Sequence, residues 1–532
     1  MGKRQGTRRD LLAWAPVLGL CADVPVRAAQ KVGSVQEGSL GFNVRDFGAT
    51  GDGATLDTLS INKAIAAVSK IGGGTVHFPA GIYLCHSIHL KSNIRLEFTN
   101  GVVIVAADPP KNNGEEGYDL TEPNEPGEKF QDFGHSHCHN SLIWGEDLEN
   151  VSICGPGLIW GRGISRGEFQ GPIAEIPGVA NKTIALKNCH DVILRDFSIL
   201  HGGHFGILTT GVDNLTIDNV KIDTNRAGID MDCCRNVRVT NCSVNAPWDD
   251  AICVKSSYAL GLPRAAEMIT ISNCMVSGSF EEGSLLDGTL KRFPPDADID
   301  RNGRIKLGTE SSGGFRNITI SNCVFDGCFG LAILSVDGAI IEDVSISNIS
   351  MRDTVASPIF IRLGSRMRSP AGAQIGAIRR INISNIVSSS TSSLMCSMIA
   401  GIPDHTIESI KLTGILLQHS GGGTTIDASR HLEELEKEYP EPTMFGNTPA
   451  HGFFIRHAKD IEISNCKVIA TSEDARPCFF LDDVAKTTFS DIRTYGATTS
   501  PLFVLENVKN IRVAKCNSLP DTEIADAKHT EL

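Results

Sequence analysis

The sequence predicts an all-β protein, a single-stranded parallel β-helix in which short strands stack coil upon coil. Three observations lead to this prediction. Alternating aliphatic and polar residues recur from about residue 150 onward, many copies end in Asn followed by Cys or Ile, and the copies at Asn214 and Asn236 start 236 − 214 = 22 residues apart. Alternation predicts a strand with one buried face. Repeats that cannot bury this face alone are expected to stack on one another.

The repeated unit is clearest in residues 214–220, 236–242, 317–323 and 461–466. A β-propeller would need longer repeats with several strands each, and a leucine-rich horseshoe would need a leucine-based consensus, which the sequence lacks. Many of the 16 cysteines follow an asparagine, at 188–189, 241–242, 273–274, 322–323 and 465–466. This regularity predicts buried thiols stacked at one position of the coil.

The chain divides into three parts. Residues 1–29 carry basic residues before a short apolar run and small residues at 26–29, which resembles a twin-arginine export signal and predicts a periplasmic or extracellular protein. The alternative is a basic tail without signal function. Residues 30–519 form the β-helix with an N-terminal cap and inserted loops, with helices expected at 58–69 and 431–438. Residues 520–532 are expected to be a polar, frayed tail.

The formal net charge of −13, without any basic block, argues against nucleic-acid binding and docking on acidic membranes. A local basic groove could still bind an acidic polysaccharide. The apolar run at 11–20 is too short to span a bilayer, and no other segment is predicted to do so. The glycine runs lack the lysine and hydroxyl residue of a nucleotide-binding loop. We therefore expect no cofactor, and a monomer.

Two adjacent carboxylates, Asp249 and Asp250, stand at the head of a short apolar strand that ends in Lys255. Clustered carboxylates on a rigid sheet are what cleavage of a glycosidic bond requires. Neighbouring residues of a strand point in opposite directions. Both carboxylates can therefore face one cleft only if the chain bends near Pro247 and Trp248.

Three segments resemble motifs of the polygalacturonase family, glycoside hydrolase family 28, in the pectate-lyase-like β-helix superfamily. They are the aspartate pair in 249–256, the segment 225–230 at the place of the family's Asn-Thr-Asp-Gly-Ile-Asp, and a glutamate-containing glycine loop at 308–314. The resemblance implies a right-handed β-helix and hydrolysis with inversion of configuration. It also implies that Asp249 is the acid and Asp250 part of the base.

The sequence departs from this family in three places. The third aspartate is replaced by Ala227, the family's histidine is absent near 301–303, and its two cations are absent near 332–334, although Arg304 and Lys306 occur one coil earlier. The missing carboxylate could be replaced by Asp230, Asp232 or Glu310. Asp230 could instead support the strand end, and Glu310 could be bound by the amides of the following glycine turn.

Candidate sugar-binding residues are Asn225, Arg226, Lys255, Lys306, Arg362 and His204. Alternation directs Arg362 away from the core, toward the groove, although a lone cation is more often plain solvated surface. His135, His137 and His139 would share one face of a strand and could ligate zinc, but no fourth ligand is visible, so we predict no metal site.

Two other functions remain open. A calcium-dependent polysaccharide lyase could use Asp230, Asp232, Asp249 and Asp250 as ligands and Lys255 or Lys306 as base. A non-catalytic glycan-binding β-helix would tolerate the altered motifs. We predict a glycoside hydrolase that acts on a pectin-like or related polysaccharide.

Overall fold

The computed structural model describes residues 41–111, 116–131, 133–166, 177–392, 394–496 and 500–532. The predicted export signal, residues 1–29, lies outside these ranges. Within them, no helix is both long enough and apolar enough to cross a membrane.

Almost all regular structure in residues 41–532 is β-strand. The first strands are Phe42–Asn43 (β1), Asp52–Leu56 (β2), Gly74–Phe78 (β3), Gly81–Cys85 (β4), Ile88–His89 (β5), Ile94–Phe98 (β6) and Val102–Ala106 (β7). The middle coils contain Ser141–Glu146 (β8), Glu149–Cys154 (β9), Leu158–Trp160 (β10), Lys182–Lys187 (β11), His190–Arg195 (β12), Ser198–Leu200 (β13), Phe205–Thr210 (β14), Asp213–Asp218 (β15), Lys221–Asp223 (β16), Ala227–Asp232 (β17), Arg235–Thr240 (β18), Ser243–Asn245 (β19), Ile252–Ser256 (β20), Ala266–Ser272 (β21), Met275–Ser277 (β22) and Ile305–Ser311 (β23). The last strands are Phe315–Asp326 (β24), Leu331–Ser335 (β25), Ile340–Arg352 (β26), Ile359–Leu363 (β27), Ala377–Thr391 (β28), Ser397–Ala400 (β29), Ile407–His419 (β30), Phe453–Ala470 (β31), Phe479–Tyr495 (β32), Phe503–Ala514 (β33) and Thr522–Glu531 (β34).

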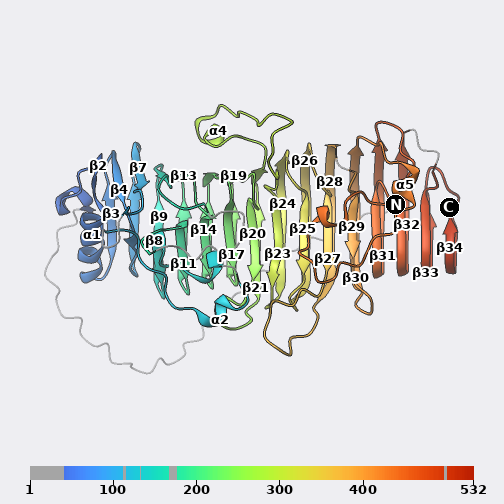
Figure 1. The fold of residues 1–532 in the computed structure, drawn as a ribbon, viewed down its shortest axis with the longest axis horizontal. Coiled ribbons are helices and arrows are strands. Elements are labelled where there is room, and N and C mark those ends of the chain that lie inside the picture. The colour runs from blue at the N-terminus through green and yellow to red at the C-terminus, as the bar shows by residue number, and fades with distance from the viewer. Residues whose placement is uncertain (1–40, 112–115, 132, 167–176, 393, 497–499) are drawn as a thin grey trace, which may run out of the picture. The chain divides into compact units, whose positions relative to one another are not determined.

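These strands stack in parallel as successive rungs, which confirms the predicted parallel β-helix (Figure 1). The rungs of one face are in register, so that Ile207, Ile229, Ile252 and Ile305 lie above one another with fully buried side chains. The alternation in each strand directs these aliphatic side chains inward and the intervening polar ones outward. The core is therefore a column of aliphatic ladders inside the coil.

The recurring asparagines sit where the chain turns, between β21 and β22 at Asn273 and within the long strands β24, β26 and β28 further on. Asn273, Asn322, Asn348 and Asn385 have φ between 55° and 57°, in the left-handed region that asparagine tolerates better than most residues. Their amides also form a ladder, with Asn348 donating to Asn322 at 3.0 Å and Asn385 donating to Asn348 at 3.1 Å. The cysteines that follow, such as Cys274, are buried free thiols, as predicted.

Both ends of the stack are covered. Helix α1 (Thr58–Lys70) packs Ile61, Ile65 and Val68 into the core, which confirms the predicted capping helix at 58–69. At the other end β34 runs antiparallel to β33. Residues 522–531 are therefore a strand of the sheet, and the expectation of a frayed tail was wrong.

Inserted segments lie outside the coils. One carries α2 (Glu125–Glu128) and α3 (Phe133–Ser136), another carries α4 (Ser284–Asp287), and α2 and α4 lie at opposite rims of the stack in Figure 1. The segment 421–451, called here the covering segment, carries α5 (Thr425–Ala428) and a 3-10 turn, Pro442–Phe445. A second short 3-10 turn, Val44–Phe47, precedes β2.

The covering segment packs on the outer face of the C-terminal strands. Its Leu432, Phe445 and Ala450 form an apolar cluster with Phe360 and other side chains that point out of the coil. The helix predicted at 431–438 is absent. Main-chain carbonyls there accept hydrogen bonds from the strands instead, such as Leu432 from Arg456 and Glu434 from Arg362.

Candidate active site

The aspartate pair lies on a turn between β19 and β20. Residues 247–249 form the turn, so the bend expected near Pro247 is present. Neighbouring coils fix it, because Trp248 N donates to Asn225 O at 2.8 Å and Gly303 N donates to Asp249 O at 2.9 Å. The turn sends the two carboxylates into different surroundings.

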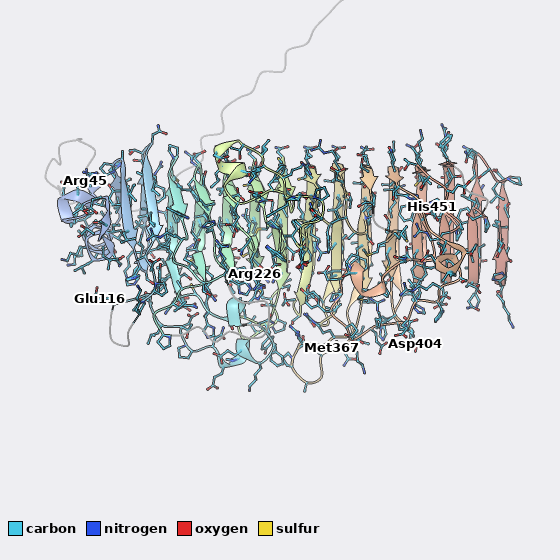
Figure 2. All side chains as sticks on the ribbon, turned by 45° about the horizontal axis from the view of Figure 1, so that its top comes forward. Arg45, Glu116, Arg226, Met367, Asp404 and His451 are labelled. Atoms are coloured by element: carbon cyan, nitrogen blue, oxygen red, sulfur yellow. The ribbon has the colours of Figure 1, made fainter. Side chains whose placement is uncertain are left out.

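Asp249 faces an open pocket of about 660 Å³, and its side chain is 26% exposed. Arg226 Nη2 lies 3.2 Å from Asp249 Oδ2 and projects near the middle of the stack (Figure 2). The walls of the pocket come from four other segments, and its lining includes Trp248, Asp300, Asn302, Lys306, Phe329, Tyr439, Glu441 and Thr443. The covering segment thus contributes Tyr439, Glu441 and Thr443 to the site.

Asp250 is buried beside this pocket, with a side chain only 3% exposed. Arg304 Nε lies 3.0 Å from Asp250 Oδ1, and Lys306 Nζ contacts Oδ2. Arg304 also pairs with Glu441 at 2.5 Å. The prediction that both aspartates are exposed is therefore wrong for Asp250, because two buried cations enclose it.

These cations keep their charge despite burial. Burial alone would lower the pKa of Lys306, but Asp250 raises it above its ordinary value. For Arg304, burial is likewise outweighed by Glu441 and Asp250, which raise its pKa. Lys306 therefore presents an ammonium group at the pocket.

Asp230 and Glu310 belong to a second, buried cluster. Lys255 Nζ lies 3.2 Å from Asp230 Oδ2 and 3.0 Å from Glu310 Oε2. His135, from α3, lies 3.4 Å from Asp230, and Arg366 lies 3.5 Å from Glu310. None of these five residues lines the pocket beside Asp249. A shift in register between β20 and β23 separates Lys306 from Glu310, although the two share parity in the sequence.

The remaining predicted residues are spread over the outer face. His204 stacks on Phe205 with ring centroids 4.4 Å apart, next to His135. Arg362 points out of the coil as predicted, but the covering segment buries it and its guanidinium donates to Gly401 O at 2.8 Å. Burial, followed by the charge of Arg456, lowers the pKa of Arg362 to about 10. Arg362 does not line the pocket, so its predicted contact with sugar there gains no support.

The histidines at 135, 137 and 139 do not share one face of a strand. His135 pairs with Asp230, whereas His137 Nε2 lies 3.0 Å from Glu128 and His139 Nε2 lies 2.8 Å from Glu146. His135 and Ser136 belong to α3, and the helical turn points the three imidazoles in different directions.

Sequence reasoning missed Asp300 as a contributor to the pocket. The proline-rich loop at 439–446 was a candidate cleft wall in the sequence, but no role was assigned to Tyr439 or Glu441. Asp300 lies in an inserted loop, and partial burial together with Asp249, Asp298 and Glu441 raises its pKa. Tyr439 and Glu441 lie far from the aspartate pair in the sequence, since Tyr439 is 439 − 249 = 190 residues beyond Asp249. A carboxylate-rich loop at 296–300 was the available signal for Asp300.

Comparison with known proteins agrees with this fold. Residues 41–101 match a family described as rhamnogalacturonase A/epimerase, pectate lyase-like, and residues 159–264 match a right-handed β-helix region. A probable polygalacturonase of Vitis vinifera is 26% identical over 296 residues, 52% of this chain and 58% of that protein. The crystal structure of an exopolygalacturonase from Thermotoga maritima superposes with a TM-score of 0.55 at 18% identity and covers 92% of this chain and 95% of that one.

The chain is a right-handed β-helix protein that is similar to polygalacturonases. This confirms the resemblance drawn from the sequence. It has other relatives as well, since a stretch of 66 residues is 48% identical to the mannuronan C5-epimerase AlgE3 of Azotobacter vinelandii, 12% of this chain and 4% of that protein. The chain thus spans about half of the grape relative and a small part of the epimerase.

Proposed function

We propose that this polygalacturonase-like protein is an exported glycoside hydrolase that cleaves a pectin-like or related polysaccharide with inversion of configuration. The observation that carries the proposal is Asp249, a carboxylate held on a fixed turn at the wall of an open pocket. Inverting hydrolysis needs a carboxylic acid and a carboxylate separated by enough space for a water molecule, roughly 6.5–9.5 Å.

Asp300 is the best candidate for the second carboxylate. It lines the same pocket, and no ion pair to it occurs in the described part of the chain. Partial burial, followed by the charge of Asp249, raises the pKa of Asp300, so Asp300 retains its proton more readily than an exposed carboxyl would. One acid and one carboxylate is the state that the reaction requires.

In this proposal Asp300, whose pKa is raised, delivers the proton to the leaving oxygen, and Asp249, held beside the Arg226 guanidinium, activates the water. This reverses the role that the family resemblance implies for Asp249. Asp250 acts through its neighbours, because it positions Arg304 and Lys306 rather than contacting solvent. The ammonium of Lys306 and the guanidinium of Arg226 are placed to bind sugar hydroxyls or a uronate carboxylate. The cluster of Asp230, Lys255 and Glu310 supports the strand ends next to the site.

The lyase alternative fits these contacts less well. Asp249 and Asp250 are engaged by Arg226, Arg304 and Lys306 rather than arranged around a cation site. A lysine base must lose its proton, whereas Asp250 raises the pKa of Lys306. Because 66 residues match an epimerase that acts on mannuronan, the experiment below also includes uronate-containing substrates.

The deciding experiment is incubation of the protein with a panel of pectic and neutral oligosaccharides, followed by NMR of the first product. We expect saturated products with inverted anomeric configuration, and none from Asp249→Asn. Unsaturated products that absorb ultraviolet light, formed only with added calcium, would establish the lyase instead. Oligosaccharide binding without any cleavage, equal in wild type and Asp249→Asn, would establish a non-catalytic binding protein.

A further inference from the structure

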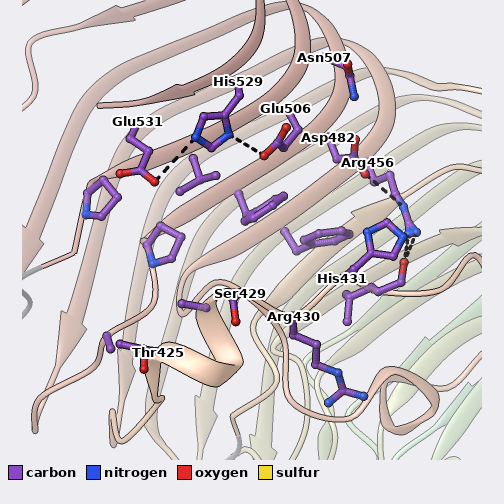
Figure 3. Close-up of a pocket in the computed structure, with 18 residues that line it drawn as sticks. Thr425, Ser429, Arg430, His431, Arg456, Asp482, Glu506, Asn507, His529 and Glu531 are labelled. Atoms are coloured by element: carbon purple, nitrogen blue, oxygen red, sulfur yellow. Dashed lines mark hydrogen bonds and ion pairs between the residues drawn. The ribbon is translucent and has the colours of Figure 1, made fainter.

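A second cavity of about 660 Å³ lies over the C-terminal strands β31, β32 and β33 (Figure 3). It shares no lining residue with the pocket beside Asp249. The covering segment separates the two, because Tyr439–Thr443 face the first pocket whereas Thr425–Leu432 face the second. This cavity plays no part in the proposed hydrolysis.

The lining includes a strip of apolar side chains. Phe454, Phe480 and Val504 occupy the same register position of three successive strands, with rungs about 4.8 Å apart. The rings of Phe454 and Phe480 are stacked, with centroids 5.7 Å apart and planes 30° apart. Pro477 and Pro501 add further apolar surface. A flat strip of this kind suits the apolar C–H face of a sugar ring.

A polar row runs beside this strip, two residues further along each strand. It consists of Arg456, Asp482 and Glu506, which are also in register. Arg456 is 2% exposed, and both of its terminal nitrogens donate to Leu432 O at 2.8 Å. Its Nη2 also lies 3.0 Å from Glu434 Oε1. Its Nε has no hydrogen-bond acceptor among the described residues, and Asp482 Oδ2 is 4.0 Å away from it.

A sugar hydroxyl would find an acceptor in Asp482, whose side chain is 24% exposed, because a hydroxyl donates to a carboxylate whereas a second carboxylate cannot. Arg456 Nε is enclosed, and the guanidinium is held in place by Leu432 O. Burial, only partly offset by Arg456 and His457, raises the pKa of Asp482, which is the result expected for a carboxylate shielded from water.

Beyond Glu506 the row continues to the last strand, where His529 and Glu531 line the cavity. His529 Nδ1 lies 2.7 Å from Glu506 Oε1, and His529 Nε2 lies 3.9 Å from Glu531, as the dashed lines in Figure 3 show. Glu506 raises the pKa of His529 through this hydrogen bond. A uronate would meet Asp482, Glu506 and Glu531 as like charges, whereas a neutral sugar offers them hydroxyl donors.

We propose that this cavity is a second carbohydrate-binding site, which takes a neutral sugar residue of a polysaccharide. The ring packs on the half-buried Phe480, which stacks on Phe454, and one hydroxyl donates to Asp482. The site anchors the polymer at a distance from the cleavage pocket, and its binding does not depend on catalysis.

The test is isothermal titration of Asp249→Asn protein, which prevents turnover, with β-1,4-galactotetraose and arabinohexaose, and with trigalacturonate as the acidic comparator. We expect a neutral oligosaccharide to bind, and Asp482→Ala and Phe480→Ala to weaken its Kd at least tenfold. Asp483→Ala is the matched control, because Asp483 is the next residue but points away from the cavity and pairs with His457 at 2.7 Å. Its Kd should stay unchanged.

Thermal unfolding of each variant excludes loss of folding as the cause. The proposal is overturned if neither neutral probe binds to folded protein at millimolar concentration, or if Asp482→Ala and Phe480→Ala bind as well as the control. It is also overturned if trigalacturonate binds more tightly than both neutral probes and depends on the same two residues. Failure of hydrolysis with intact binding here would refute only the proposed function.

Discussion

Asp249 and Asp250 are adjacent, yet replacement of Asp250 by asparagine should lower mainly the stability, whereas replacement of Asp249 should lower mainly the turnover. In Asp250→Asn, the buried cations Arg304 and Lys306 lose their shared counter-charge, since side chains 1% and 3% exposed cannot turn to water. Removing one partner of a buried ion pair costs about 3–5 kcal/mol. Glu441 still pairs with Arg304 at 2.5 Å, which places the expected loss near the lower end, about 3 kcal/mol.

Asp249→Asn should behave differently. Asp249 is 26% exposed and its pair with Arg226 is partly solvated, so the stability loss should stay within about 1 kcal/mol. Turnover should fall by a factor of about 10²–10⁴, the usual contribution of a general acid or base. Urea unfolding gives the stabilities, and release of reducing ends from the cleaved oligosaccharide gives the turnover. An Asp250→Asn protein as stable as wild type, or a fully active Asp249→Asn protein, would refute the reasoning.

Three further predictions follow from the same contacts. In Asp249→Asn the pKa of Asp300 should fall toward its ordinary value, because one of the charges that raise it is gone; carboxyl ¹³C NMR titration measures this, and an unchanged pKa would show that the two carboxylates are uncoupled. Burial lowers the pKa of His419 to about 4 and that of His451 to about 3, from an ordinary 6.5, so the unfolded chain binds more protons below pH 6.5. The contribution of these two histidines to the free energy of unfolding should therefore be fully present above pH 6.5. It should fall toward pH 4 by about 1.4 kcal/mol per pH unit for each histidine, roughly 6 kcal/mol for the two together, and replacing both histidines by glutamine should flatten this profile. Asn322→Val should cost about 1–2 kcal/mol because a β-branched residue is strained at φ 56°, whereas Asn322→Gly, the matched control, should cost less; equal losses in thermal unfolding would contradict this.

The fold was predictable because its information is local and repeated. Each alternating segment specifies its own strand, and Asn specifies where the chain turns, as at Asn322 and Asn348. The sequence also indicated a bend near Pro247, because strand alternation requires one before Asp249 and Asp250 can share a cleft. The bend is present, but it separates the two carboxylates, so the expectation that both face one cleft was wrong for Asp250.

The rest of the site depends on contacts that no local pattern records. The covering segment brings Glu441 to Arg304, 137 residues away. It also buries Arg362, whose outward direction was predicted correctly but whose exposure was not. The helix expected at 431–438 failed for the same reason, because carbonyls such as that of Glu434 bond to the strands instead of to their own turn. Tertiary hydrogen bonds there replace the local ones on which helix prediction relies.

The antiparallel direction of β34 has a consequence for assembly. A parallel coil leaves a row of free amides and carbonyls at its last rung, which another molecule could extend end to end. Reversing the final strand breaks the repeat, since a further parallel rung would no longer find matching side-chain ladders. Charged residues along that strand, including Glu523, Asp526 and Lys528, oppose an incoming edge as well. The stack therefore has a terminus that discourages growth into filaments.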